Sequence, residues 1–226
     1  MWNTIKEDIS AIRDRDPAVK SWVEAILCYP GLHALFFYRI AHFLYSIKLF
    51  LLARMISNIG RLLTGIEIHP GAKIGKGIFI DHGMAVVIGE TTVIGDNVTI
   101  YQGATLGGTG KEKGKRHPTI EENVVISSGA KILGPFTVGK NSKIGAGSVV
   151  LKEVPPNCTV VGVPGRIVVK DNKKLKLVNC KDEIDLDQVR LPDPVHQEIE
   201  CLKERIEVLE NYIYKMEGGV TNEISD

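Results

Sequence analysis

The sequence has few cysteines, almost no net charge and no apolar run long enough to cross a membrane. Its four cysteines lack a CxxC or other metal-ligand spacing, which favours a reduced, cytoplasmic setting. A formal charge of +1 over 226 residues implies no general attraction to nucleic acid or to an anionic membrane surface. Residues 1–16 are charged throughout, so we expect no signal peptide.

The most apolar segment, residues 40–59, is interrupted by His42, Lys48 and Arg54. Its uninterrupted runs are shorter than the roughly 20 residues that a membrane-spanning helix needs, so we expect one buried or subunit-facing helix and no membrane contact. Residues 1–65 as a whole show apolar residues at helical spacing and are predicted to form an N-terminal helical domain.

Isoleucine, valine or leucine recurs every six residues through the middle of the chain. A period of six fits neither an amphipathic helix nor an alternating strand, and it is typical of hexapeptide repeats, each of which forms one short strand and one turn of a β-helix. Three repeats make one turn, so each buried aliphatic residue should stack on the one 18 residues further on. The pattern predicts a β-helix of about four turns over residues 66–168. Thirteen positions carry it: Ile68, Ile74, Ile80, Ile88, Ile94, Ile100, Leu106, Ile120, Ile126, Ile132, Val138, Ile144 and Val150.

Two interruptions break this period. Two extra residues fall between Ile80 and Ile88, and eight fall between Leu106 and Ile120. The longer insertion is polar and rich in glycine, so we expect an exposed loop. Loops on a rigid scaffold commonly carry function, and we therefore expect the chemistry at these interruptions.

A charged stretch over residues 169–193 is interpreted as a linker. Beyond it, apolar residues alternate at spacings of four and three, which predicts a coiled-coil helix over residues 194–217. The alternative is one amphipathic helix packed on its own domain. Residues 218–226 are predicted to be a disordered tail. The expected fold class is α+β, with an N-terminal helical domain, a parallel β-helix of hexapeptide repeats and a C-terminal coiled-coil helix.

Several motifs in this frame resemble those of the serine O-acetyltransferases, which acetylate the serine hydroxyl from acetyl-CoA on the route to cysteine. The resemblance covers residues 10–170. It implies a left-handed β-helix, homotrimers alone or in larger assemblies, active sites between neighbouring subunits, and L-serine and acetyl-CoA as substrates. The motifs are Arg15-Asp16-Pro17, Ile68-His69-Pro70, Asp81-His82-Gly83, Ile88-Gly89-Glu90-Thr91, Thr105-Leu106-Gly107-Gly108-Thr109-Gly110, Arg116-His117-Pro118 and Gly162-Val163-Pro164.

The resemblance makes His82 the catalytic base. A serine hydroxyl is a poor nucleophile until a base removes its proton, and an imidazole titrates near neutral pH, so it can take and return protons. The family commonly has aspartate directly before Ile-His-Pro, where it orients this histidine, and this chain has Glu67 there. Glu67 is expected to hold the imidazole in the required tautomer; the alternative is a solvated charge.

Four further residues are implied to contact serine. Arg116 is a natural partner for the serine carboxylate, and His117 is implicated in catalysis or in positioning the substrate. Asp16 and Asp81 resemble the carboxylates that receive the serine ammonium group. Asp16 has a structural alternative, since it is also placed to cap a helix that starts at Pro17. The three lysines of the inserted loop are interpreted as solvated.

By the same resemblance, acetyl-CoA lies in the groove between adjacent β-helices, along Gly108, Ser128, Lys143 and Ala146. Small residues let its pantetheine arm approach exposed backbone; the alternative is that they are ordinary turn residues. Cysteine is expected to be able to occupy the serine site as an inhibitor. A complex with O-acetylserine sulfhydrylase is not expected, because the sequence ends Glu-Ile-Ser-Asp and not in isoleucine.

The sequence also suggests other classes of protein. The histidines His69, His82 and His117 suggest a zinc-bearing trimeric β-helix such as a gamma-class carbonic anhydrase. Those enzymes use a closely spaced histidine pair, whereas the separations here are 13 and 35 residues, so no metal is expected. A non-catalytic trimeric scaffold and a related acetyltransferase acting on a sugar or another amine remain alternatives.

Overall fold

The computed structural model describes residues 2–110 and 113–170, together with Ile199, Lys203, Ile206, Leu209 and Glu210. Those five residues are helical. The rest of the predicted coiled coil, the linker from residue 171 onward and the tail lie outside the described residues.

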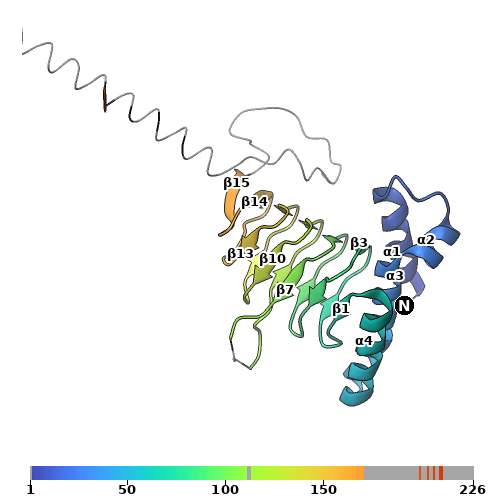
Figure 1. The fold of residues 1–226 in the computed structure, drawn as a ribbon. Helices are drawn as coiled ribbons and strands as arrows, with labels where there is room; N and C mark the ends of the chain where they lie inside the picture. The colour runs from blue at the N-terminus through green and yellow to red at the C-terminus, as the bar shows by residue number, and fades with distance from the viewer. Residues whose placement is uncertain are drawn as a thin grey trace, which may run out of the picture. The chain divides into compact units, whose positions relative to one another are not determined.

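The predicted helical N-terminal region is confirmed, but its details differ. The helices are α1 (Trp2–Arg15), α2 (Trp22–Cys28), α3 (Pro30–Ser46) and α4 (Phe50–Thr64). The single helix expected over residues 40–59 is wrong, because the chain reverses at Lys48, whose φ is 65°, and α3 and α4 pack side by side (Figure 1). Apolar residues recur at helical spacing on both sides of Lys48, and this spacing therefore hides the reversal.

The structural alternative for Asp16 is also wrong. Helix α1 ends at Arg15, and the next helix begins only at Trp22. Its N-cap is Ser21, whose hydroxyl accepts the backbone N–H of Glu24 at 3.1 Å. Asp16 instead accepts the backbone N–H of Ala18 at 2.8 Å, which closes a turn between the two helices.

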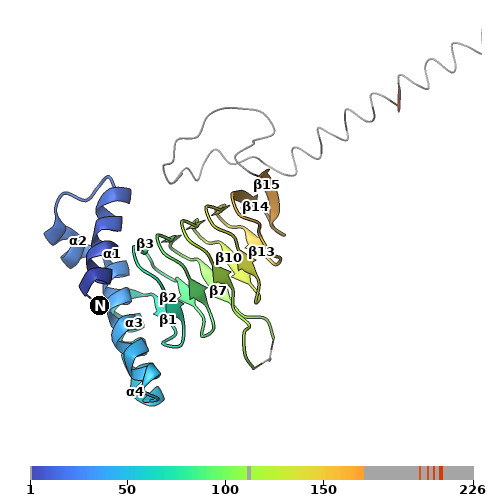
Figure 2. The same ribbon diagram turned by 180° about the vertical axis from the view of Figure 1, so that it is seen from behind.

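The hexapeptide repeats form a three-sided parallel β-helix, as predicted (Figures 1 and 2). The first sheet contains β1 (Glu67–Ile68), β4 (Val87–Ile88), β7 (Thr105–Gly107), β10 (Lys131–Leu133) and β13 (Val149–Val150). The second contains β2 (Lys73–Ile74), β5 (Val93–Ile94), β8 (Thr119–Ile120) and β11 (Thr137–Val138). The third contains β3 (Phe79–Asp81), β6 (Thr99–Tyr101), β9 (Val125–Ile126), β12 (Lys143–Ile144), β14 (Cys158–Val161) and β15 (Arg166–Lys170).

The predicted stacking of aliphatic residues is confirmed. Ile120 pairs with Val138 and Ile126 pairs with Ile144, in each case 18 residues apart. Leu106 pairs with Ile132, 26 residues further on, because the eight-residue insertion lies between them. These side chains are 0–1% exposed, so each turn is buried by the turns above and below it. The chain also adds a partial fifth turn, in which Val160 pairs with Ile144 and the antiparallel strand β15 closes the end. This turn is two residues short, which is why the six-residue period missed it.

The helices close the other end of the β-helix by hydrogen bonding. Many backbone N–H groups of one turn donate to carbonyls of the following turn, as Glu67 does to Val86. No turn precedes the first, so its carbonyls that face the helices have no such donor. Side chains of the helices take that place. The donors are Ser57 to Ile68, His42 to Pro70, Tyr38 to Ala72, Arg39 to Gly75 and Arg15 to Gly77. An edge of unpaired backbone groups is thereby covered.

Candidate active site

The inserted loop leaves the β-helix between β7 and β8 (Figure 2) and returns to it at Arg116 and His117. Thr91, in the turn between β4 and β5, holds the returning end. Its hydroxyl accepts the backbone N–H of Arg116 at 3.0 Å and that of His117 at 3.1 Å. The base of the loop is thus fixed to the β-helix.

His117 is buried against the first sheet, with 9% of the residue exposed. Its Nδ1 contacts the backbone N–H of Thr91 at 3.2 Å and the Thr91 hydroxyl at 2.9 Å. One side of the ring lies against Gly89, where any Cβ would overlap the imidazole. Burial, with the positive charge of Arg116, lowers the pKa of His117, so its neutral form is favoured.

Arg116 belongs to a network that reaches the helical domain. Its guanidinium forms an ion pair with Glu90, and the other oxygen of Glu90 accepts the hydroxyl of Tyr45 at 3.1 Å. The bond from Arg116 lowers the pKa of Glu90. The ring of Tyr45 packs edge-on against His69, with centroids 5.9 Å apart. Arg116 is therefore oriented before any substrate binds.

His82 occupies a different corner, between β3 and β4. Its backbone is in the left-handed region, with φ 54°, and its side chain is 76% exposed. The Nε2 atom lies 3.9 Å from Oδ1 of Asp81. Burial and the charge of Asp16 raise the pKa of Asp81, whereas His82 lowers it. Asp16 also accepts the hydroxyl of Tyr29 at 2.5 Å, so an imidazole and two carboxylates gather here.

Glu67 lies on β1 and forms an ion pair with Arg61, with Nη1 and Oε2 3.0 Å apart. Both side chains are partly exposed, so this pair is screened by solvent and contributes little stability. The predicted contact between Glu67 and His82 stays a prediction.

The site residues fall into two groups at opposite edges of the first sheet. His82 lies where the chain passes from a strand of the third sheet to a strand of the first sheet. Ser128 and Ala146 occupy the corresponding positions on later turns. Arg116 and His117 lie where the first sheet gives way to the second, and Gly108 is beside them. Lys143 is buried in β12 with 6% exposure. One chain therefore holds the two histidines apart, with the first sheet between them.

Three contributors to these groups were not predicted. Glu90 and Thr91 belong to the Ile88-Gly89-Glu90-Thr91 motif, but the sequence predicted no role for them. A carboxylate and a hydroxyl one turn of the β-helix before the inserted loop are a usable signal. Tyr45 gave no signal, since it comes from a helix 45 residues before Glu90. Only the folded structure brings it to the loop.

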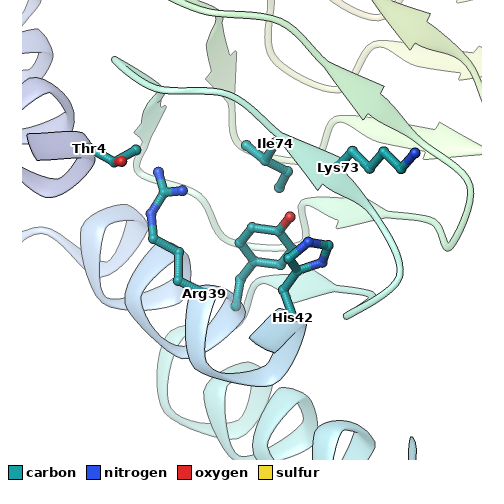
Figure 3. Close-up of a pocket in the computed structure, with 6 residues that line it drawn as sticks. Thr4, Arg39, His42, Lys73 and Ile74 are labelled. Atoms are coloured by element: carbon teal, nitrogen blue, oxygen red, sulfur yellow. The ribbon is translucent and has the colours of Figure 1, made fainter. Parts of the chain in front are cut away.

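A pocket of about 300 Å³ lies elsewhere, between the helices and the second sheet (Figure 3). Arg39 and His42 of α3 line it, and both already donate to carbonyls of the first turn. The side chain of Lys73 extends away from them (Figure 3). None of the predicted site residues lines this pocket, so we assign these side chains to closing the β-helix.

Within residues 2–110 and 113–170 and the five helical residues beyond, no group of three or more histidine, cysteine, aspartate and glutamate side chains is placed to hold a metal ion. Among the same residues, no helix is both long and apolar enough to span a membrane.

Comparison with known proteins gives the family. Residues 1–36 match the family described as serine acetyltransferase, N-terminal, and residues 117–152 match bacterial transferase hexapeptide (six repeats). The serine acetyltransferase of Bacillus licheniformis is 57% identical over 213 residues, which cover 94% of this chain and 95% of that protein. The chain belongs to the serine acetyltransferase family. The predicted activity, acetyl transfer from acetyl-CoA to serine, is thereby confirmed.

Solved structures agree with this assignment. A serine acetyltransferase of Neisseria gonorrhoeae in complex with serine is 43% identical, with a TM-score of 0.72 over 74% of this chain and 69% of that one. A Brucella abortus serine acetyltransferase in complex with coenzyme A is 47% identical, with a TM-score of 0.71 over 74% of this chain and 67% of that one. The predicted fold and the predicted co-substrate are confirmed.

Proposed function

We propose that this chain transfers the acetyl group directly, within a ternary complex, with His82 as general base. The observation that carries the proposal is the corner at which an exposed imidazole lies beside Asp81 and Asp16. His82 removes the proton of the serine hydroxyl, and the alkoxide attacks the thioester carbonyl. The tetrahedral intermediate collapses, the C–S bond breaks, and the imidazolium returns its proton to the CoA thiolate. Glu67 orients His82 in this scheme.

Charge at the two corners fits the two ends of a zwitterionic amino acid. Asp81 and Asp16 supply negative charge for the serine ammonium group, and Arg116 supplies a guanidinium for its carboxylate. Because one chain holds these corners apart, we propose that the site forms between neighbouring copies of a homotrimer. Acetyl-CoA then follows the same groove, past Ser128 and Ala146 on one chain and Gly108 on the other, with Lys143 behind it.

Cysteine differs from serine only at its side-chain atom, so the same charged groups are suited to bind it as a competitor. A serine acetyltransferase solved in complex with cysteine, 46% identical with a TM-score of 0.77 over 84% of this chain and 71% of that one, supports this part of the proposal. The setting we propose is the cytoplasm.

The C-terminal heptads are proposed to stabilise the trimer. Three copies attached to one β-helix trimer start close together, and the high effective concentration favours a three-stranded coil. Light scattering of a chain ending near Pro192 tests this. Loss of mass or of thermal stability supports the proposal, and unchanged values contradict it.

The proposed function is tested by measuring CoA thiol release from acetyl-CoA with serine, homoserine or an amino sugar as acceptor. Release with serine in preference to the others is expected. Release only with an amino sugar indicates a related acetyltransferase, and no release with any acceptor indicates a scaffold.

A further inference from the structure

Thr91 has a role that the proposed mechanism does not use. A threonine hydroxyl has two lone pairs and one hydrogen. Two backbone N–H groups, those of Arg116 and His117, donate to Oγ1 of Thr91 at 3.0 and 3.1 Å. Both lone pairs are then engaged, so the hydroxyl hydrogen is left for the third neighbour, Nδ1 of His117 at 2.9 Å.

The same ring nitrogen faces a second donor. The backbone N–H of Thr91 lies 3.2 Å from Nδ1 of His117, and a backbone N–H can only donate. Two donors converge on Nδ1, so this nitrogen must present its lone pair to them. In a neutral imidazole the proton is then on Nε2.

We infer that Thr91 locks His117 in the neutral Nε2–H tautomer, which makes His117 a fixed hydrogen-bond donor to an oxygen of bound serine and not a base. This inference rests on the proposed function for the identity of the substrate, whereas the tautomer itself follows from the contacts alone. Thr91 is accordingly a positioning residue that acts through His117.

The surroundings of the ring support the neutral form. Charged and titratable neighbours are Arg116 and Lys115 on the loop, Glu90 beyond Gly89, and His69 on the first turn. The positive charges outnumber the single carboxylate, and burial also disfavours an imidazolium.

The Nε2 side of the ring packs against two glycines. A Cβ on Gly89 would lie 2.1 Å from Nε2 and one on Gly108 would lie 3.2 Å from it, so a side chain at Gly89 would overlap the ring and one at Gly108 would crowd it. Glycine at both positions therefore allows the imidazole to occupy this place. To act as a base, His117 would need a free lone pair. Its lone pair is on Nδ1, where Thr91 already donates to it, so Nε2 could accept a proton only after a change of tautomer.

The direct test is nitrogen NMR of the histidine side chains in the full-length wild-type protein at neutral pH, with His117→Gln to assign the signal. The chain has six histidines, so the spectrum is tractable. We expect His117 to show a protonated Nε2 and an unprotonated Nδ1. A protonated Nδ1, alone or together with Nε2, overturns the inference. This measurement does not depend on activity, so it stands whether or not serine is the substrate.

The role of Thr91 in substrate binding is tested with three variants. Thr91→Val should raise the KM for serine about tenfold, since a hydrogen bond is lost and polar groups are left unsatisfied, with little change in the KM for acetyl-CoA. Thr91→Ser keeps the hydroxyl and should restore the serine KM. Thr92→Val is the matched control, because Thr92 is fully buried and its Oγ1 has no hydrogen-bond partner within the described residues.

Two outcomes separate the inference from the proposed function. An unchanged serine KM in Thr91→Val, in an enzyme whose wild type acetylates serine, contradicts the role of Thr91 and leaves the proposed function intact. A wild type that releases no thiol with serine contradicts the proposed function, and the NMR spectrum then still decides the tautomer.

Discussion

The two corners of the first sheet place their histidines in opposite surroundings. The side chain of His82 is 76% exposed, stands on a left-handed backbone position and has a carboxylate 3.9 Å away. His117 is 9% exposed, and one of its nitrogens is held by Thr91 at 2.9 and 3.2 Å. An imidazole that changes protonation during a reaction needs access and a nearby compensating charge, whereas one that positions a substrate needs rigidity.

Charge separates the corners in the same sense. The carboxylates of Asp81 and Asp16 lie at the His82 corner, whereas the His117 corner has a net positive charge, with Arg116 and Lys115 against the single carboxylate of Glu90. A zwitterionic substrate has one charge of each sign, so neither corner alone matches it. On the proposed mechanism, each edge of a chain supplies half of a serine site, and the first sheet between the two edges prevents one chain from completing it.

The largest expected effect comes from removing the exposed histidine. General-base assistance contributes roughly 10²–10⁴-fold to rate, so His82→Ala should lower kcat by about that factor. Acetyl-CoA binding, measured by calorimetry, should be nearly unchanged because the proposed acetyl-CoA path follows Gly108, Ser128 and Ala146. Turnover close to that of the wild type would remove His82 from the mechanism.

Mixing two inactive variants sharpens the comparison further. If sites form between copies, co-expressed His82→Ala and His117→Ala chains will pair an intact His82 corner with an intact His117 corner in about a quarter of the sites. Thiol release should recover to about that fraction of the wild-type rate, well above either variant alone. Equal mixing of chains assembled separately is the control. No recovery on co-expression would mean that each chain contains its own complete site.

The repeat made most of the β-helix predictable, because Ile120 and its equivalents have no other place to be buried. The predicted site residues His82, Arg116 and His117 lie at the two interruptions of the repeat. The repeat pattern does not predict contacts between segments that are distant in the sequence. The hydroxyls of Tyr38 and Ser57 satisfy carbonyls of the first turn, and no local pattern marks a tyrosine or a serine for that task.

The helical domain was predicted less well for a related reason. Apolar residues recur at helical spacing on both sides of Lys48, so their periodicity alone predicts one helix where the structure has α3 and α4. The same limit applies to the site. Thr91 lies in a motif of the sequence, but the three hydrogen bonds of its hydroxyl form only when the loop has folded back.

A smaller effect is expected where the helical domain contacts the His117 corner. Tyr45→Phe removes the hydroxyl that donates to Glu90 at 3.1 Å, so Glu90 and its partner Arg116 gain freedom. A lost hydrogen bond of about 0.5–1.5 kcal/mol corresponds to a rise of roughly two- to tenfold in the KM for serine, with kcat nearly unchanged. Tyr38→Phe is the matched control, since its hydroxyl donates to Ala72 at 2.7 Å and should affect thermal stability alone. Equal effects of the two variants on KM would rule out a specific link from Tyr45 to the substrate.

The smallest effect tests the cost of gathering carboxylates at the His82 corner. Burial and the charge of Asp16 raise the pKa of Asp81 above its unfolded value, so ionised Asp81 costs folding free energy at pH values above its folded pKa. That cost is lost as pH falls through the folded pKa and is absent below the unfolded value of 3.8. Asp81→Asn should therefore raise the free energy of unfolding at neutral pH by roughly 1 kcal/mol or less, which gives a slightly higher Tm, and should no longer do so near pH 4.

The same Asp81→Asn variant should bind serine less tightly, because the ammonium group loses a carboxylate. Asp14→Asn, at an exposed aspartate of α1, is the control and should change neither Tm nor the serine KM. A stabilised variant with weaker serine binding indicates that ionised Asp81 costs folding free energy but is needed to bind serine. If Tm falls at neutral pH instead, the ionised carboxylate stabilises the fold, and the contrast between the two corners is then one of exposure and rigidity alone.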